Sequence, residues 1–349
     1  MARDLAPDWI LKETMAIQAQ SAQWFKDKQA EFAGEKPLTL TVLGCGDLGT
    51  AILSGIFDSL SPSDVPDQAK ALAPADPSTP ARLPTRFSAC VTRPESGKRI
   101  QDELAKYETK VTIHENNNLQ AVQDADVVIL GCKPELAERI LRGNEMRSAL
   151  QGKVLISILA GVTEAQLSSI IYPKGPAPAF GGCRIVRAMP NIAATVRESM
   201  TVIAKSDPPL SEETDKLVTW IFTRIGRVVH LPSENMDACT ALCGSGPGFV
   251  AIMLESMVAG AVAMGVPREE AYIMAAQTMR GTTGLVLQGG EHPALVRDRV
   301  MTPGGCTVGG MLVLEEGGLR GTIAKAVREA TVVASQLGEG KQGVNGTRF

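Results

Sequence analysis

The chain is poor in aromatic rings and in histidine. Aromatic residues make up 4% of its 349 residues, and it has 3 histidines. Few rings argue against a stacking surface for single-stranded nucleic acid, and a net charge of −3 argues against a basic nucleic-acid surface. The histidines do not cluster, so we expect structural or solvated roles for His114 in a polar loop, His230 at a strand end and His292 at a helix start.

The cysteines form no pattern typical of disulfides or metal sites. There are 7, an odd number, with no C-x-x-C pair, and most lie in apolar runs where cysteine behaves as a small hydrophobe. Cys239 and Cys243 are one helical turn apart but have no further ligand nearby, so we expect no metal. This usage predicts reduced thiols in a cytoplasmic protein.

Long uninterrupted apolar runs are also missing. The densest run, Phe249 to Val266, contains Glu255 and ends at Pro267, so it is shorter than the roughly 20 apolar residues of a membrane span. We expect a buried helix at a subunit interface and no membrane partner. Residues 1–37 show no secretory or transit pattern and are expected to form a helical extension on the body or on a partner subunit.

The remaining 312 residues suggest two domains. Between 38 and 231, short apolar runs alternate with helical stretches, which is typical of a mostly parallel sheet covered on both faces. Six prolines mark residues 61–86 as a surface insertion. From 232 to 349 the strand signals stop and an all-helical domain is expected. The predicted strands are Leu38–Leu43, Phe87–Val91, Asp126–Leu130, Val154–Leu159, Ile185–Met189, Met200–Ala204 and Arg227–Leu231.

A glycine motif stands directly after the first predicted strand. In Gly44-Cys-Gly-Asp-Leu-Gly49, the strand before and the helix after supply the context that a dinucleotide-binding turn requires. Gly44 would make the tight turn, Gly46 would admit a pyrophosphate, and Gly49 would let helix and strand pack. The sequence therefore predicts an α/β protein with an N-terminal Rossmann-type doubly wound sheet.

The choice of cofactor depends on the end of the second strand. The run Thr92-Arg93-Pro94-Glu95 follows Val91 there, and an arginine with a hydroxyl neighbour suits a 2′-phosphate better than a bare ribose. We therefore expect NADPH, with NADH as the alternative.

Three more motifs should lie at the same edge of the sheet, because ligands collect where parallel strands end. They are Gly131-Cys-Lys-Pro134, Ala160-Gly161 and Met189-Pro-Asn191. Lys133 could place a cation near phosphates or a substrate carboxylate.

Far downstream, Thr302-Pro-Gly-Gly-Cys-Thr307 forms a turn between helices. Backbone N–H groups of such a turn suit a small carboxylate, and two threonine hydroxyls flank it. One part of the chain is thus suited to a dinucleotide and another to a small acid, as in a reductase.

These motifs together resemble the pyrroline-5-carboxylate reductases. The resemblance covers about residues 38–337 and includes the signature run from Asp237 to Phe249 and the block from Glu291 to Gly318. It implies that the helical domain is a dimerisation domain, that dimers often assemble further, and that each active site borrows the Pro-Gly-Gly loop from a partner subunit.

The resemblance also implies the site residues. Thr307 and Thr240 would be catalytic, and the substrate would be held by Thr302, Gly304, Gly305, Cys306 and Thr307. The cofactor would be lined by Gly44, Cys45, Gly46, Asp47, Leu48, Gly49, Thr92, Arg93, Asn118, Cys132, Lys133, Pro134 and Ala160.

The activity implied is NADPH-dependent reduction of the cyclic imine 1-pyrroline-5-carboxylate to L-proline. The chain departs from the family pattern at Ile192, Ala193, Cys243, Phe249, Cys306 and Thr302. These changes leave open a related or substituted cyclic imino acid of secondary metabolism. A non-catalytic NADPH-binding protein is a further alternative, whereas a β-hydroxyacid dehydrogenase is disfavoured because no lysine lies between Lys216 and Lys325.

Overall fold

The computed structural model describes residues 37–60, 79–175, 177–178, 181–339, 341, 343–344 and 346–347. The expected N-terminal extension, apart from Pro37, and residues 61–78 of the expected insertion lie outside these ranges. The chain divides into two compact units between Ser233 and Glu234, two residues from the expected boundary.

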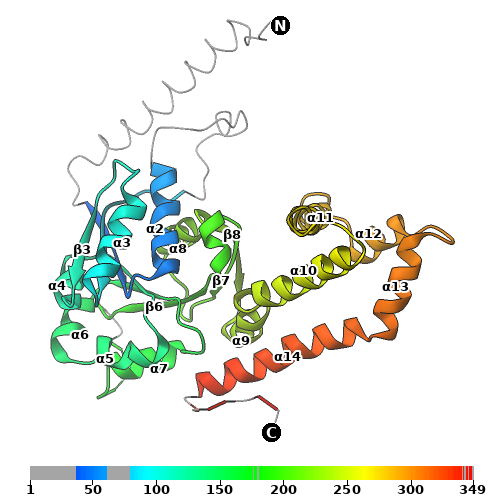
Figure 1. Cartoon of the computed structure of the whole chain (residues 1–349). Coiled ribbons are helices and arrows are strands. Elements are labelled where there is room, and N and C mark those ends of the chain that lie inside the picture. Colours follow the sequence, from blue (N-terminus) through cyan, green and yellow to red (C-terminus); the bar gives the residue numbers. More distant parts are fainter. Residues whose placement is uncertain are drawn as a thin grey trace, which may run out of the picture. The chain divides into compact units, whose positions relative to one another are not determined.

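The first unit is built on an eight-stranded sheet in the order β3-β2-β1-β4-β5-β6-β7-β8 (Figure 1). All neighbouring strands pair in parallel except β6 and β7, which are antiparallel. The first six strands have the order of a dinucleotide-binding sheet, which confirms the predicted fold. The strands are β1 (Leu38–Leu43), β2 (Pro84–Val91), β3 (Val111–Glu115), β4 (Val127–Leu130), β5 (Val154–Ser157), β6 (Arg184–Met189), β7 (Ser199–Ala204) and β8 (Gly226–Leu231).

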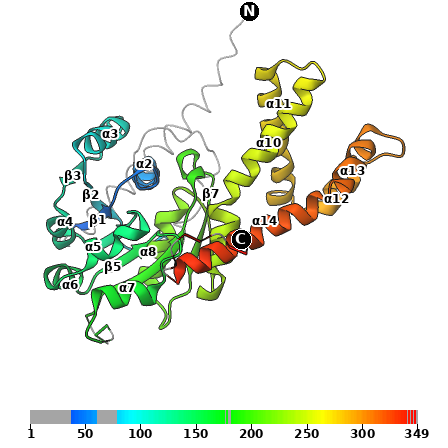
Figure 2. The ribbon, with the colours of Figure 1, turned by 60° about the horizontal axis from the view of Figure 1, so that its bottom comes forward.

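Helices cover both faces of this sheet (Figure 2). One core layer lies under α2 (Asp47–Leu60), α3 (Pro94–Leu104) and α8 (Glu212–Thr223). The other layer lies under α4 (Asn118–Asp124), α5 (Ala137–Leu141), α6 (Asn144–Leu150) and α7 (Glu164–Ile171). Because both faces are covered, the central strands are almost continuously apolar, and this pattern made them predictable.

Two details of the sheet differ from the expectations. The prediction that His114 lies in a polar loop is wrong, since it belongs to β3. This strand lies at the sheet edge, and its sequence VTIHE carries too few apolar residues to signal a strand. The expected insertion also ends earlier, because β2 begins at Pro84 and includes Thr85 and Arg86.

The second unit is helical, as predicted. It contains α9 (Met236–Cys239), a π-helical turn η4 (Thr240–Gly244), α10 (Gly246–Ala263), α11 (Arg268–Leu287), α12 (Pro293–Val300), α13 (Cys306–Glu316) and α14 (Leu319–Gly338). The acidic pair Glu315-Glu316 ends α13 before Gly317, as expected for a helix end.

This helical unit buries little of its apolar surface within one chain. A small core joins Val258 of α10 to Ala271 and Ala275 of α11, and α13 has no buried residue. Within a single chain only Val258 of α10 is buried, so the burial expected for this helix depends on the expected subunit interface. The large exposed apolar side chains of the unit include Ile252, Met257, Met264, Ile273, Met274, Leu312 and Val313.

The helical stretch Ser233–Ala263 is long and apolar enough to cross a membrane by length and composition. Its most apolar window has a mean hydropathy of 1.5 and is 6% buried within the chain. A single such helix among the described residues is weak support for a membrane, because a helix that packs against a second subunit has the same composition.

Truncation of Phe57 tests the first core layer. Its ring is fully buried and meets the rings of Phe87 and Tyr107 edge-on, with centroids 4.8 Å and 5.5 Å away. We expect Phe57→Ala to lower the free energy of unfolding by about 3–5 kcal/mol, because it removes buried area and leaves a cavity. Urea unfolding at fixed protein concentration measures this. Val229→Ala, at a 40% exposed side chain, is the control, and equal losses in both variants would contradict the packing described.

Candidate functional site

The three glycines after β1 have three different surroundings. Gly44 has φ +74°, and a Cβ built there would lie 2.6 Å from the Cα of Cys132. A Cβ on Gly49 would lie 2.9 Å from Cγ1 of Val42, so α2 packs closely on β1. A Cβ on Gly46 meets nothing within 4 Å. Gly44 and Gly49 are thus fixed by packing, whereas Gly46 borders open space.

The glycine loop is held rigidly by its neighbours in the sheet. The amide of Cys45 donates to the carbonyl of Cys90 at 3.0 Å, and the amide of Gly131 donates to the carbonyl of Leu43 at 2.8 Å. The hydroxyl of Thr50 donates to the carbonyl of Gly46 at 2.9 Å. At the start of α2, the first amides have no carbonyl one turn back to bond, which makes this end of the helix suitable for an anion.

The loop after β2 carries Thr92 and Arg93, both exposed, with Arg93 at the N-cap position of α3. Asn116 holds this loop in place. Its φ is +51°, its backbone N–H donates to the carbonyl of Val91 at 2.9 Å, and its side-chain Nδ2 donates to the carbonyl of Thr92 at 2.9 Å. The sequence reasoning did not identify Asn116, although an asparagine run is a recognisable signal for this left-handed conformation.

The remaining cofactor candidates lie at the same edge. Cys132 is half-buried and Lys133 is exposed at the N-cap of the short 3-10 helix η1 (Pro134–Leu136). Ala160 is exposed after β5, and Asn118 opens α4 after β3. Because β1 to β5 are all parallel, the structure brings every cofactor candidate to the carboxyl edge of one sheet.

The thiols at this edge are not poised to react. Burial raises the pKa of Cys45 and Cys90 to about 12 and that of Cys132 to about 11. They are therefore neutral at physiological pH and unsuited to act as nucleophiles. Their place in the glycine loop and in β2 is explained by packing.

The turn after β6 is tied to the dinucleotide-binding helix. Asn191 accepts a bond from the amide of Ala193 and starts the 3-10 helix η2 (Ile192–Val196). Arg197, with φ +62°, then bonds Asp58 through Nε at 3.0 Å and Ser54 through Nη2 at 2.7 Å. Arg197 could not be identified from the sequence, because its partners on α2 are more than 130 residues away.

In the second unit, residues Thr302–Gly305 form the expected turn between α12 and α13. Gly304 has φ +70°, and the amide of Gly305 donates to the carbonyl of Thr302 at 2.9 Å. Thr302, Gly304 and Cys306 are exposed and Thr307 is half-buried at the start of α13. The turn thus combines an exposed glycine backbone with the N-terminus of an 11-residue helix, which suits a carboxylate.

Thr240 lies in a different part of the second unit. It opens the π-helical turn η4, and its hydroxyl donates to the carbonyl of Met236 at 2.8 Å. Figure 1 shows α9, which η4 follows directly in the chain, at one end of the helical unit and the turn between α12 and α13 at the other. Between them runs α10, whose 18 residues span about 27 Å. One chain therefore does not bring its own Thr240 and Thr307 together.

Residues 39–161 match the family of NADP oxidoreductases, coenzyme F420-dependent, and residues 233–337 match the pyrroline-5-carboxylate reductase dimerisation family.

Proteins named pyrroline-5-carboxylate reductase are similar to this chain over most of its length. A pyrroline-5-carboxylate reductase of Lophium arboricola is 59% identical over 89% of this chain and 97% of its own, and that of Neurospora crassa is 48% identical over 89% and 96%. A solved pyrroline carboxylate reductase of Plasmodium falciparum with NADP bound shares the fold, with 23% identity, a TM-score of 0.66, and coverage of 86% of this chain and 98% of that one. The chain belongs to the pyrroline-5-carboxylate reductase family.

Proposed function

We propose that the chain reduces 1-pyrroline-5-carboxylate to L-proline with NADPH, as its family name indicates. The observation that carries this is the joint presence of two features. The glycine loop Gly44–Gly49 follows the first strand of the first unit, and a Pro-Gly-Gly turn precedes α13 in the second unit. The first suits a dinucleotide and the second a small carboxylate.

The residues at the sheet edge fit NADPH. A Cβ at Gly46 would project into open space, so the backbone there is accessible to a pyrophosphate. The N-terminus of α2 would bind the phosphates, and Arg93 with Thr92 would bind the 2′-phosphate. Cys132, Lys133, Pro134, Ala160 and Asn118 would line the rest of the cofactor. When bound, NADPH supplies the hydride that reduces the C=N carbon.

The Pro-Gly-Gly turn would fix the imine. The amide of Gly304 would donate to the substrate carboxylate, with Thr302 and Cys306 beside it. The expected donation by Gly305 would require its amide to leave the carbonyl of Thr302, which it bonds within the turn. The hydroxyl oxygen of Thr307 would accept a hydrogen bond from the protonated ring nitrogen and so keep the proton on that nitrogen. Since a protonated imine is already electrophilic, the chain mainly orients the ring and places charge.

We propose that two copies complete each site. The turn η4, which holds Thr240, and the start of α13, which holds Thr307, lie at opposite ends of the helical unit of one chain (Figure 1). Both threonines can therefore line one active site only if the Pro-Gly-Gly turn comes from a partner. The same pairing would cover the exposed apolar side chains of α10, α11 and α13. The homodimer would then form through the helical unit.

We propose that the chain resides in the cytosol, because its cysteines form no disulfides. All 7 cysteines are free, and 4 of them are buried. This usage is typical of a reducing compartment.

The activity is tested with the purified full-length chain by following NADPH absorbance. The proposal predicts oxidation of NADPH with 1-pyrroline-5-carboxylate and slower turnover with piperideine-carboxylates. Faster turnover with a larger or substituted ring would favour the alternative substrate suggested by Ile192 and Ala193, which sit in η2 beside the sheet edge. Cofactor binding without oxidation by any cyclic imino acid would identify a non-catalytic protein.

Gly46→Ala should separate cofactor binding from folding. Its methyl group would meet no protein atom within 4 Å but would occupy the space proposed for the pyrophosphate. We expect an unchanged unfolding midpoint and an NADPH affinity at least about tenfold weaker. Gly44→Ala is the contrast, because its positive φ and its contact with Cys132 predict loss of stability. Wild-type affinity in Gly46→Ala would exclude this site.

Arg93→Ala should change the choice between cofactors. Loss of the guanidinium should reduce the ratio of NADPH to NADH affinity about tenfold, because only NADPH has the 2′-phosphate. Arg86→Ala removes another exposed arginine from β2 and is the control. An unchanged ratio in Arg93→Ala would show that another residue selects the cofactor.

Thr307→Ala should slow the chemical step. We expect kcat to fall by roughly 5- to 150-fold, because an orienting hydrogen bond to the ring nitrogen is lost, while the Kd for NADPH is unchanged. Thr307→Ser keeps the hydroxyl and should retain most of the activity. Full activity in Thr307→Ala would remove this residue from the mechanism.

A further inference from the structure

An ion pair joins the glycine loop to the neighbouring helix. Nη1 of Arg99, on α3, lies 2.6 Å from Oδ1 of Asp47 and 3.0 Å from Oε1 of Glu103. Asp47 is the first residue of α2 and follows Gly46 directly. The contact joins Asp47 of the glycine motif to a residue 52 positions away that lies outside the motif.

The negative charge of the Asp47 carboxylate opposes the binding of an anionic ligand at this loop. It stabilises the N-terminus of α2, where a negative charge interacts well with the helix dipole. The same helix end is where the proposed function places the pyrophosphate. With 74% of its side chain exposed, Asp47 would repel that ligand unless its charge were balanced nearby.

Arg99 is placed to balance this charge. Its side chain is 38% exposed and lies between two carboxylates, so its position is restrained. Its charge also reaches into the loop, because it acts on the thiol of Cys45 and opposes the effect of burial on the pKa of that group. Arg93 is the N-cap residue of the helix that carries Arg99, so one helix presents both cations to the cofactor edge.

We infer that Arg99 is a positioning residue that masks the carboxylate of Asp47 and so lets the glycine loop accept the pyrophosphate of the cofactor. This rests on the proposed function of the loop. Asp47 would contribute its backbone amide, and its side chain would be held by Arg99. Because NADPH and NADH share the pyrophosphate, Arg99 acts on both alike, unlike Arg93.

If Arg99 only stabilised the fold, the variants would behave differently. Exposed ion pairs contribute little to folding stability, so the loss of Arg99 should leave the chain folded in either case. Only charge masking predicts that removing the carboxylate as well restores cofactor binding.

The test compares Arg99→Gln, Asp47→Asn and the double variant in the full-length chain. Kd values for NADPH and NADH are measured by nucleotide fluorescence at low and high salt, with thermal unfolding as the check on folding. Arg99→Gln should weaken both nucleotides about three- to tenfold, and the weakening should shrink at high salt. The double variant should return to within about twofold of the wild-type Kd.

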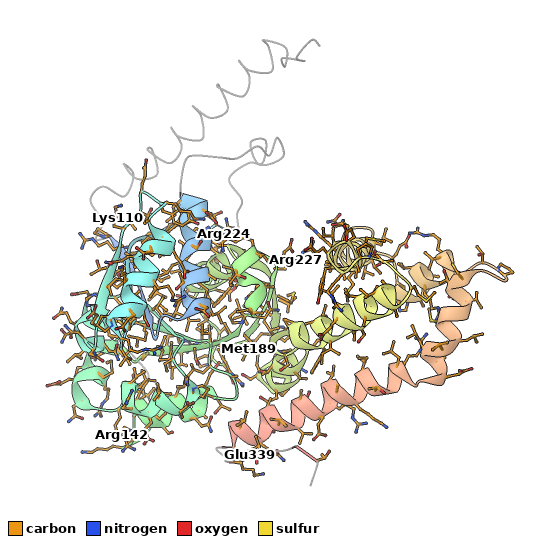
Figure 3. The ribbon with its side chains drawn as sticks, viewed as in Figure 1. Lys110, Arg142, Met189, Arg224, Arg227 and Glu339 are labelled. Carbon is orange, nitrogen blue, oxygen red and sulfur yellow. The ribbon has the colours of Figure 1, made fainter. Side chains whose placement is uncertain are left out.

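Arg142→Gln is the matched control. Arg142 pairs with Glu138 one helical turn away, is exposed, and lies at the outer edge of the first unit (Figure 3). It should leave both Kd values unchanged.

Four results would overturn the inference. An unchanged Kd in Arg99→Gln would show that the ion pair has no part in binding. A double variant as weak as Arg99→Gln would show that Arg99 contacts the nucleotide itself. Loss of NADPH binding alone, with NADH unaffected, would move Arg99 to the 2′-phosphate. A wild-type chain that bound no NADPH would overturn the proposed function, and this inference with it.

Discussion

The structure of the cofactor edge depends on one tight turn from β1 into α2. This turn passes so close to the loop after β4 that a side chain at Gly44 would overlap the backbone of Cys132. Bonds from Cys45 to Cys90 and from Gly131 to Leu43 hold it against both neighbouring strands. The N-terminus of α2 is thereby fixed at the edge where β2, β4 and β5 also end. The roles that we propose for Arg93, Arg99 and Lys133 all depend on that placement.

The helical unit buries only part of its apolar surface within one chain. Val258, Ala271 and Ala275 form one small core, while the long helices carry large apolar side chains on exposed faces. Family membership explains this, since residues 233–337 match a dimerisation domain. The free energy that a single chain cannot gain by burial is gained by association. The same arrangement separates η4 from the α12–α13 turn within one chain, and for this reason we proposed that the turn of each site comes from a partner.

Much of the fold was readable from the sequence, and the failures have physical reasons. Apolar strands buried on both faces gave strong signals, but the edge strand Val111–Glu115 did not, because its exposed positions are polar. The roles of Gly44 and Gly49 followed from their spacing. Asn116, Arg197 and Arg99 were missed, because each acts through a contact with a segment distant in sequence. The apolar run at α10 predicted burial at a subunit interface, and within one chain only Val258 of this helix is buried.

A dinucleotide that binds the backbone amides at the start of α2 should shield them from solvent. Hydrogen–deuterium exchange of the full-length chain with and without NADPH measures this shielding. We expect slower exchange in peptides covering residues 44–50 and 131–134 when NADPH is bound. Saturating NADPH that left both segments unchanged, and protected a different part of the sheet, would contradict it.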